Sequence, residues 1–367
     1  GTPAKFQVLV PGEVADPGSD PSATGKTSAT PISQQAGAAF TILVNAVDAY
    51  WNVCDIDADH PSFVATPTVR ITSSDSMATL PPNEALIAGT MDFRVTLGTV
   101  NSPTITATGV LGPPDSMIGM SATSIGVPVT AGPAAGLAFT TQPPDNPPAT
   151  HGTTFASPVV VTVTDAYGNK ALTATSAVTV SKLKDTPLSG GHPGIVGGGL
   201  TVNAVAGVAT FNNLNVQGIG THYQLLAEAT GLTSAESAPF DITPRPITVT
   251  AVTYSKAYDG TTTVPPPVAP STAGVPSITS GSLAEGDSAT WFETFDTPLP
   301  GANKTLTPDG VIRDSDHDED GQENYDVTWV EVNTGVITGT AIIVPGAMDL
   351  GTANRGDTVT SSESELS

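Results

Sequence analysis

Residues 48–52 read Asp-Ala-Tyr-Trp-Asn, and residues 165–169 read Asp-Ala-Tyr-Gly-Asn. Each copy follows a run in which apolar and polar residues alternate. A second pair of landmarks, the Ala-Gly steps at residues 88–89 and 206–207, repeats at nearly the same interval. Two landmarks that share one interval predict two copies of one domain of roughly 115–120 residues.

The repeated pentapeptide is expected to form the turn that ends a strand, because an Asp side chain accepts hydrogen bonds from backbone two residues further on. Gly168 stands where a positive φ is expected, and Trp51 replaces it in the first copy, so we expect the two turns to differ in type. We expect the tyrosine to cover the end of the core. A ligand site at this loop is the alternative.

The composition favours many short strands joined by tight turns. The chain of 367 residues contains 37 Gly and 33 Pro, and its few aromatic residues require cores of Val, Ile, Leu and Ala. Strands are expected near residues 4–10, 38–48, 66–72, 90–97, 102–109 and 121–130 in the first copy, and near 135–141, 155–164, 174–182, 200–204, 208–211, 220–229 and 235–242 in the second. About seven short strands per copy predict an all-β chain of tandem β-sandwiches with few or no helices.

Segments that contain glycine and proline predict where one domain ends and the next begins. We expect one sandwich over residues 1–131, with a polar loop from Glu13 to about Gln35, and a second over 132–243. A third is expected over 244–344, followed by a linker or tail over 345–367. Proline-containing linkers extend the chain between domains, so the array should be elongated.

Charge and sequence ends limit the classes of function. A net charge of −23 excludes nucleic acid as a partner and disfavours anionic lipid, and the absence of an apolar run of ~18 residues predicts no direct membrane insertion. The chain opens at Gly1 without a signal-like segment, so we interpret it as a mature, processed or excised form of an exported, extracellular or cell-surface protein. The single cysteine, Cys54, is expected to be a small packing residue and not a reactive thiol.

Three segments of the second copy, residues 137–143, 161–169 and 207–214, resemble bacterial immunoglobulin-like tandem repeats of the invasin and intimin type. The first copy resembles a longer, proline-rich relative. The third region resembles the YDG repeat of filamentous-haemagglutinin-like surface proteins; it contributes residues 247–251, 256–262, 286–287 and 323–328. These resemblances imply immunoglobulin-like sandwiches on a cell surface, and they imply no catalytic residues.

An acidic segment near the end of the third domain is a candidate calcium site. Its carboxylates are those of Asp314, Asp316, Asp318, Asp320 and Asp326. Alternate carboxylates followed by a glycine match the start of a calcium loop, but the position of the expected bidentate Glu is a valine. Two interpretations therefore remain open, a Ca²⁺ site of modest affinity and a solvated acidic loop; no other cofactor is expected.

A second acidic set, Asp55, Asp57 and Asp59 with His60, has the same alternation but lacks the glycine, so it is a weaker metal candidate. The five histidines stand singly, without the spacing of a zinc site. We found no nucleophile elbow, phosphate loop or dinucleotide fingerprint, and we expect no enzymatic activity.

Tandem sandwiches leave sheet edges that an extended peptide from a neighbour can complete. The N-terminal strand, with Ala4, Phe6, Val8 and Val10 on alternate positions, is our candidate for an inter-subunit strand; pairing within its own domain is the alternative. The sequence thus predicts a non-catalytic extracellular structural protein that self-associates as the subunit of a filament, sheath or surface layer. The alternative is an adhesin or a carbohydrate-binding stalk that contacts surface glycans.

Overall fold

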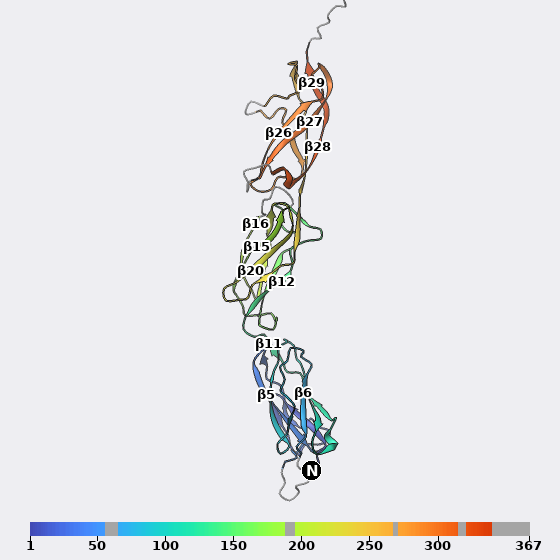
Figure 1. Ribbon diagram of the computed structural model, residues 1–367, viewed down its shortest axis with the longest axis vertical. Helices are drawn as coiled ribbons and strands as arrows, with labels where there is room; N and C mark the ends of the chain where they lie inside the picture. Colours follow the sequence, from blue (N-terminus) through green and yellow to red (C-terminus); the bar gives the residue numbers. More distant parts are fainter. Residues whose placement is uncertain (56–64, 188–194, 267–270, 315–320, 340–367) are drawn as a thin grey trace, which may run out of the picture. The chain divides into compact units, whose positions relative to one another are not determined.

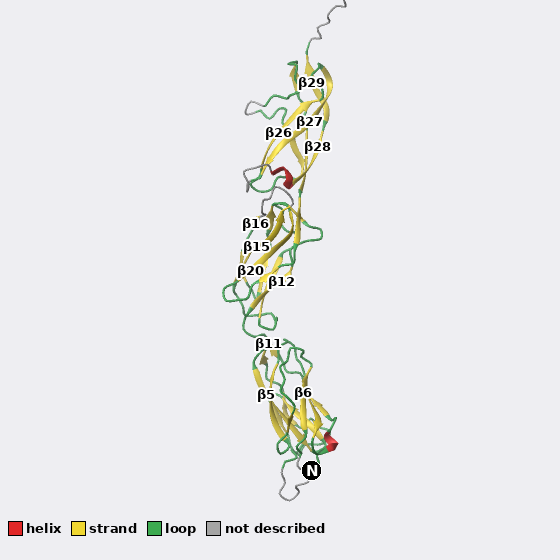
Figure 2. Cartoon of the chain, in the orientation of Figure 1, coloured by secondary structure: helices red, strands yellow, loops and turns green. Residues whose placement is uncertain are grey.

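The computed structural model describes residues 1–55, 65–187, 195–266, 271–314 and 321–339. Their regular structure is almost entirely β-strand, with two short 3₁₀ turns at Asp115–Met117 and Gly321–Asn324 (Figure 2). The prediction of an all-β chain is confirmed. The chain divides into two units, Gly1–Arg245 and Pro246–Ser367.

The first domain is a sandwich of two antiparallel sheets (Figure 1). One sheet has the order β1 (Lys5–Leu9), β5 (Ala39–Val47), β8 (Thr90–Thr96), and the other has the order β10 (Ser121–Thr123), β9 (Ile105–Leu111), β6 (Thr68–Ser73), β7 (Glu84–Ala85). The alternation in β5 places Ile42, Val44 and Ala46 in the core, where each is completely buried. Burial of these aliphatic side chains is the main favourable contribution to the stability of the sandwich.

The second domain repeats this plan. Its first sheet is β12 (Gly136–Thr141), β14 (Val159–Thr164), β18 (Val208–Phe211), and its second is β13 (Ala149–Thr150), β22 (Phe240–Thr243), β20 (Gly220–Glu228), β15 (Ala177–Pro187), β17 (Thr201–Asn203), with β21 (Ala235–Glu236) beside β20. A small extra pair joins β16 (Ile195–Gly197) to β19 (Asn215–Gln217).

Local geometry confirms the internal repeat. Ala88 and Gly89 have φ of 50° and 78°, and Ala206 and Gly207 have φ of 50° and 76°. Two successive positive φ values define the tight turn that suits the twist of a hairpin, which explains the recurring Ala-Gly step. Ser124 and Ser237 also correspond, because each hydroxyl accepts from the backbone N–H of the neighbouring strand and donates to the following carbonyl.

Each domain has a short parallel pair that links an early strand to the last one. In the first domain β4 (Gln34–Gln35) pairs with β11 (Val129–Thr130), and in the second β13 pairs with β22.

The segment after β1 differs from its prediction as a loop. It contains a hairpin of β2 (Glu13–Ala15) and β3 (Lys26–Ala29). The Lys26 ammonium forms an ion pair with Glu13 at 2.6 Å and donates to the Val8 carbonyl at 3.0 Å. These contacts between distant residues hold the short strands, whose own sequence is polar and carries no alternation.

The second unit is also a sandwich. One sheet has the order β25 (Ser277–Ser280), β23 (Arg245–Thr250), β28 (Tyr325–Val330), and the other has the order β24 (Ser255–Ala257), β29 (Val332–Thr338), β27 (Gly301–Arg313), β26 (Ser288–Phe295). Strand β24 pairs in parallel with β29. The core of this domain consists of two small clusters, one around Leu306 and one around Ile312.

Candidate functional site: the joint between the first two domains

The repeated turn has one construction in both copies. In the second, Asp165 Oδ1 accepts from the backbone N–H groups of Tyr167 and Asn169, both at 2.9 Å. In the first, Asp48 Oδ1 accepts from Tyr50 at 2.8 Å and from Asn52 at 3.0 Å. The predicted Asp-anchored turn is therefore present twice.

The expected difference in turn type is wrong. Trp51 has φ of 68° and Gly168 has φ of 82°, so the tryptophan adopts the same left-handed conformation as the glycine. That conformation costs a residue with a Cβ about 1–2 kcal/mol. Contacts of the indole offset the cost: it lies on Gly25, the Lys5 ammonium is 3.4 Å from its ring centroid, and its N–H donates to the Asp20 carbonyl at 3.3 Å.

In the second copy the turn lies against the first domain. Asn169 Nδ2 donates to the Gly98 carbonyl at 2.6 Å, and the Val100 N–H donates to Asn169 Oδ1 at 3.0 Å. One side-chain amide thus binds a carbonyl and an N–H of a single loop that follows β8. This pair of bonds fixes both position and orientation, because the donor and acceptor of the amide cannot be exchanged.

Tyr167 covers the core of the first domain. The prediction placed it over the core of its own domain, and that prediction is wrong. Its ring packs on the first hydrophobic cluster, between Gly37 and Gly98. A Cβ on Gly37 would lie 2.7 Å from the ring, and one on Gly98 would lie 2.5 Å from it. Both glycines therefore make room for the tyrosine.

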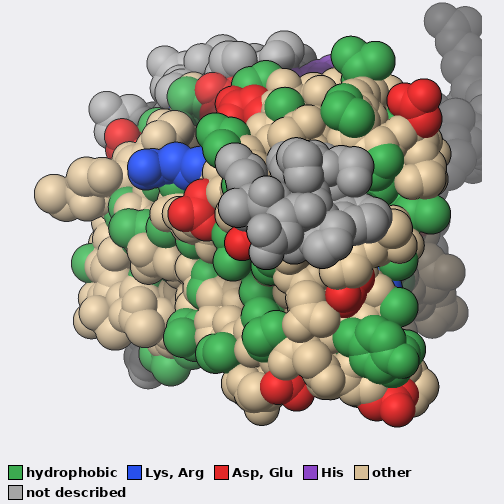
Figure 3. All heavy atoms as spheres, turned by 90° about the horizontal axis from the view of Figure 1, so that it is seen from below, with side chains coloured by type: hydrophobic (Ala, Val, Ile, Leu, Met, Phe, Trp, Pro, Cys, Tyr) green, Lys and Arg blue, Asp and Glu red, His purple; other side chains and the backbone are tan. Residues whose placement is uncertain are grey.

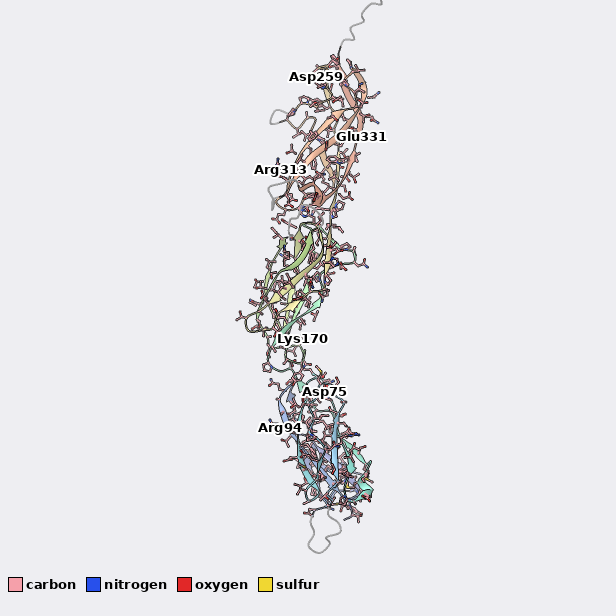
Figure 4. The ribbon with its side chains drawn as sticks, in the orientation of Figure 1. Asp75, Arg94, Lys170, Asp259, Arg313 and Glu331 are labelled. Atoms are coloured by element: carbon pink, nitrogen blue, oxygen red, sulfur yellow. The ribbon has the colours of Figure 1, made fainter. Side chains whose placement is uncertain are left out.

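Asp75 builds the loop that receives Asn169. Its carboxylate is buried and accepts from the N–H groups of Gly98 at 2.7 Å, Thr99 at 3.0 Å and Met77 at 2.9 Å. Burial alone would raise the pKa of Asp75, but these bonds and that from the Thr99 hydroxyl outweigh it and hold the pKa below its usual value. Asp75 and Lys170, which follows Asn169, are labelled on the two domains in Figure 4.

Asp165 also binds the linker between the domains. Its Oδ2 accepts from the Gly132 N–H at 2.7 Å and from Asn169 Nδ2 at 2.9 Å. Burial opposes ionisation, yet the bonds from Asn169, Gly132 and Tyr167 together hold the pKa of Asp165 below its ordinary range. A single carboxylate thus joins the turn, the linker and the amide that contacts the first domain.

The N-terminal strand lies within its own domain. Strand β1 pairs antiparallel with β5 over Lys5–Leu9, and Phe6, Val8 and Val10 are buried in the first core, whereas Ala4 is exposed. In this chain the N-terminal strand pairs within its own domain, which was the alternative. Exchange of the strand between subunits stays a prediction.

Of the five candidate calcium ligands, only Asp314 and Asp326 lie among the described residues. Asp314 is buried and accepts from Asn324 Nδ2 at 2.6 Å, and Asp326 is exposed at the start of β28. Asp316, Asp318 and Asp320 lie outside the described residues, as do Asp57, Asp59 and His60 of the second acidic set. Calcium binding therefore remains a prediction.

Cys54 is a buried packing residue, as expected. Gly89 lies against the Cys54 carbonyl, and the equivalent Gly207 lies against the Ala171 carbonyl. Cys54 therefore occupies the position that Ala171 has in the second copy. Burial raises the pKa of its thiol to about 11, which leaves little thiolate at neutral pH.

The motifs of the third domain hold its loops. Lys256 Nζ donates to Asp259 Oδ1 at 2.8 Å and to the carbonyls of Thr261 and Thr263. The bond from Lys256 is the largest influence on the Asp259 carboxyl, whose pKa falls to about 2. The Tyr325 hydroxyl donates to Asp287 and accepts from the Ala284 N–H. These residues brace the fold.

Sequence reasoning missed Glu293. This residue of β26 is 1 % exposed; its Oε2 accepts from the Val252 N–H at 2.9 Å, and its Oε1 has no hydrogen-bond partner. Burial raises the pKa of its carboxyl, and the Val252 bond opposes that effect only in part. The alternation of β26 points to an inward position at 293, but nothing local marks it as special.

Comparisons with known proteins give weak structural overlaps. No family model matches, and no curated protein matches. The solved structures with detectable similarity include the D00-D0 domain of intimin, at 10 % identity and a TM-score of 0.28, with 65 % of this chain and 98 % of that one covered. Domains 4–9 of the surface layer protein SbsC overlap at 18 % identity and a TM-score of 0.22, with 77 % and 48 % covered.

A beta-glycosidase from Bacteroides vulgatus overlaps at 13 % identity and a TM-score of 0.21, with 66 % of this chain covered. The chain spans about a quarter of the length of the glycosidases it matches. Overlaps at this level identify neither a family nor a function. Within the described residues, no helix has the length and hydropathy needed to cross a membrane.

Proposed function

We propose that this chain is a non-catalytic structural segment of an extracellular or cell-surface assembly, a repeating subunit of a filament, sheath or surface layer. The observation that carries the proposal is the joint formed by Asn169, Tyr167 and Asp165. Asn169 belongs to the turn that is repeated in both domains. Its side chain connects the second domain to the first through two hydrogen bonds to the loop that contains Gly98 and Val100. Such a joint sets the spacing and orientation of successive domains, as an assembly subunit requires.

Four carboxyl groups that anchor turns and loops support the proposal. The pKa values of Asp48, Asp75, Asp165 and Asp259 are all lowered, and each carboxylate anchors a turn or loop. A general acid near neutral pH needs a raised pKa. Glu293 has a raised pKa, but its side chain is buried inside the sandwich.

Electron microscopy of the purified chain, with and without calcium, tests the proposal. We expect ordered polymers or sheets whose repeat does not depend on added ligand. The competing adhesin or glycan-binding role predicts particles that stay single at all concentrations and bind to a glycan array. A monomer that binds glycans would reject the structural assignment in favour of the stalk.

A further inference from the structure

The turn at residues 48–52 resembles the turn at residues 165–169, which contacts the first domain, in the partners of its Asp carboxylate. Strand pairing aligns Lys5 with Val47 and Gly136 with Thr164, so Gly1 and Gly132 stand at the same place before their strands. The Gly132 N–H donates to Asp165 Oδ2 at 2.7 Å, and the Gly1 nitrogen lies 3.2 Å from Asp48 Oδ2. The terminal amine of Gly1 forms an ion pair with Asp48 and so occupies the place that the Gly132 N–H has beside Asp165.

The two copies differ in what covers them. Tyr50 is 55 % exposed and Asn52 is exposed, whereas Tyr167 and Asn169 are half-buried against a neighbouring domain. Within the described residues, the hydrogen bonds of the Asn52 side chain are both to Asp48, so its carbonyl oxygen is free to accept as Asn169 Oδ1 does from Val100. Figure 3 shows the molecule from the end at which the first domain lies in Figure 1; hydrophobic and acidic side chains share its described surface.

We propose that the turn Asp48–Asn52 is a docking element for the loop end of another β-sandwich domain of the first domain's type. The partner must offer a backbone carbonyl and, two residues later, a backbone N–H, as Gly98 and Val100 do. It must also have glycines beside that loop, where Gly37 and Gly98 make room for a tyrosine. Tyr50 then fills that space and the Asn52 amide makes the paired hydrogen bonds.

The inference rests on the proposed role as an array of domains, and its test is separate from assembly. A chain with residues 1–131 duplicated directly ahead of Gly1 recreates the Ala131–Gly132 connection. In the extended chain, the backbone N–H that corresponds to Val100 in the added copy should exchange about tenfold or more slowly than an unpaired N–H, because it donates to Asn52 Oδ1 as Val100 donates to Asn169 Oδ1. Tyr50→Ser with Asn52→Ala, made in the copy that follows the duplication, should abolish that protection. Fast exchange of that N–H in the added copy, unaffected by the double variant, would overturn the proposal, whatever microscopy shows of polymers.

A second variant covers the case in which the added domain does not fold. Gly168→Trp gives the second turn the sequence of the first within the natural chain. If the first-copy turn is competent to dock, residues 98–100 keep their protection from exchange in this variant, and the matched Asn169→Ala variant loses it. The backbone N–H groups of Tyr167 and Asn169, which bond Asp165, report whether the turn itself is intact in Gly168→Trp. Loss of protection at residues 98–100 in both variants, with these turn amides still protected, would show that a turn with tryptophan cannot dock, and would equally overturn the proposal.

Discussion

Glu293 is a carboxyl group buried in the third domain, and its ionisation should be visible in stability. Because burial raises the pKa of its folded form, the folded state holds this proton more tightly than the unfolded state. The protonated Glu293 carboxyl contributes favourably to the free energy of unfolding at pH values below its unfolded pKa of about 4.5. This contribution is lost as the pH rises through the pKa of the folded state.

We therefore expect Glu293→Gln to stabilise the second unit at pH 7 and to leave it little changed at pH 4, as measured by urea denaturation across that range. Glu331→Gln is the matched control, since Glu331 is exposed on the same sandwich and accepts from the Thr307 hydroxyl (Figure 4). Equal pH profiles for Glu293→Gln and the parent chain would contradict the assignment.

Asn169 and Asn52 form a natural pair for measuring the joint. Each bonds the Asp of its own turn, but only Asn169 also bonds Gly98 and Val100. Asn169→Ala should lower the free energy of unfolding of the first unit by about 1–3 kcal/mol more than Asn52→Ala, the worth of two hydrogen bonds. A difference near zero in matched denaturation curves would mean that the joint adds nothing to stability.

The hairpin of β2 and β3 protects a sheet edge. Strand β1 is at the edge of its sheet, and Lys26 bonds both the Val8 carbonyl of that edge and the fully buried carboxylate of Glu13. Lys26→Ala leaves Glu13 buried without its cation, so we expect a loss of about 3–5 kcal/mol. The double variant Lys26→Met with Glu13→Gln should be milder, and size-exclusion chromatography should show more self-association for Lys26→Ala as the edge opens.

Strand β1 also decides what a truncation can show. Removing residues 1–11 deletes Phe6, Val8 and Val10 from the first core, so we expect the first domain to unfold and the third-domain transition to persist. Circular dichroism melts check this. If the shortened chain keeps a folded first domain, β1 is dispensable there and the exchange of this strand between subunits gains support.

The strands of the two repeats were predictable because alternation and turn residues are local signals. Strands β5, β8, β17 and β18 lie within a residue or two of their predicted ranges. What the sequence could not reveal is contact at long range. Asn169 reads as a turn residue, and its partner Gly98 lies in another domain; the short strands of the β2–β3 hairpin depend on Lys26 reaching β1. The left-handed conformation of Trp51 was not predictable for the same reason, because the residues that contact its indole, Lys5, Asp20 and Gly25, are distant in sequence.

For the whole molecule, the joint predicts how many transitions heating produces. The first two domains belong to one compact unit and the third forms the other. Calorimetry of the intact chain should therefore give two transitions, and Tyr167→Ser with Asn169→Ala should split the larger into two. Three separate transitions in the parent chain would show that the first two domains unfold independently.

Calcium remains a separate question at this scale. If the carboxylates between Asp314 and Asp326 bind the ion, calorimetric titration should give a saturable heat, and Asp316→Asn with Asp318→Asn should remove it. Absence of heat, together with melting that a chelator does not change, would favour the solvated loop.

The short parallel pairs β4–β11, β13–β22 and β24–β29 have a mechanical consequence. In a parallel pair, the start of one strand and the end of the other lie at opposite ends of the ladder. Strands β1, β12 and β23 precede these pairs in their domains, so tension applied through the chain reaches a pair once the earlier strand has detached. It then pulls the two paired strands along each other and loads their hydrogen bonds in shear, all at once, instead of unzipping them singly. Every domain carries such a clamp, so a chain stretched between two anchored points should give way domain by domain, each at its own force.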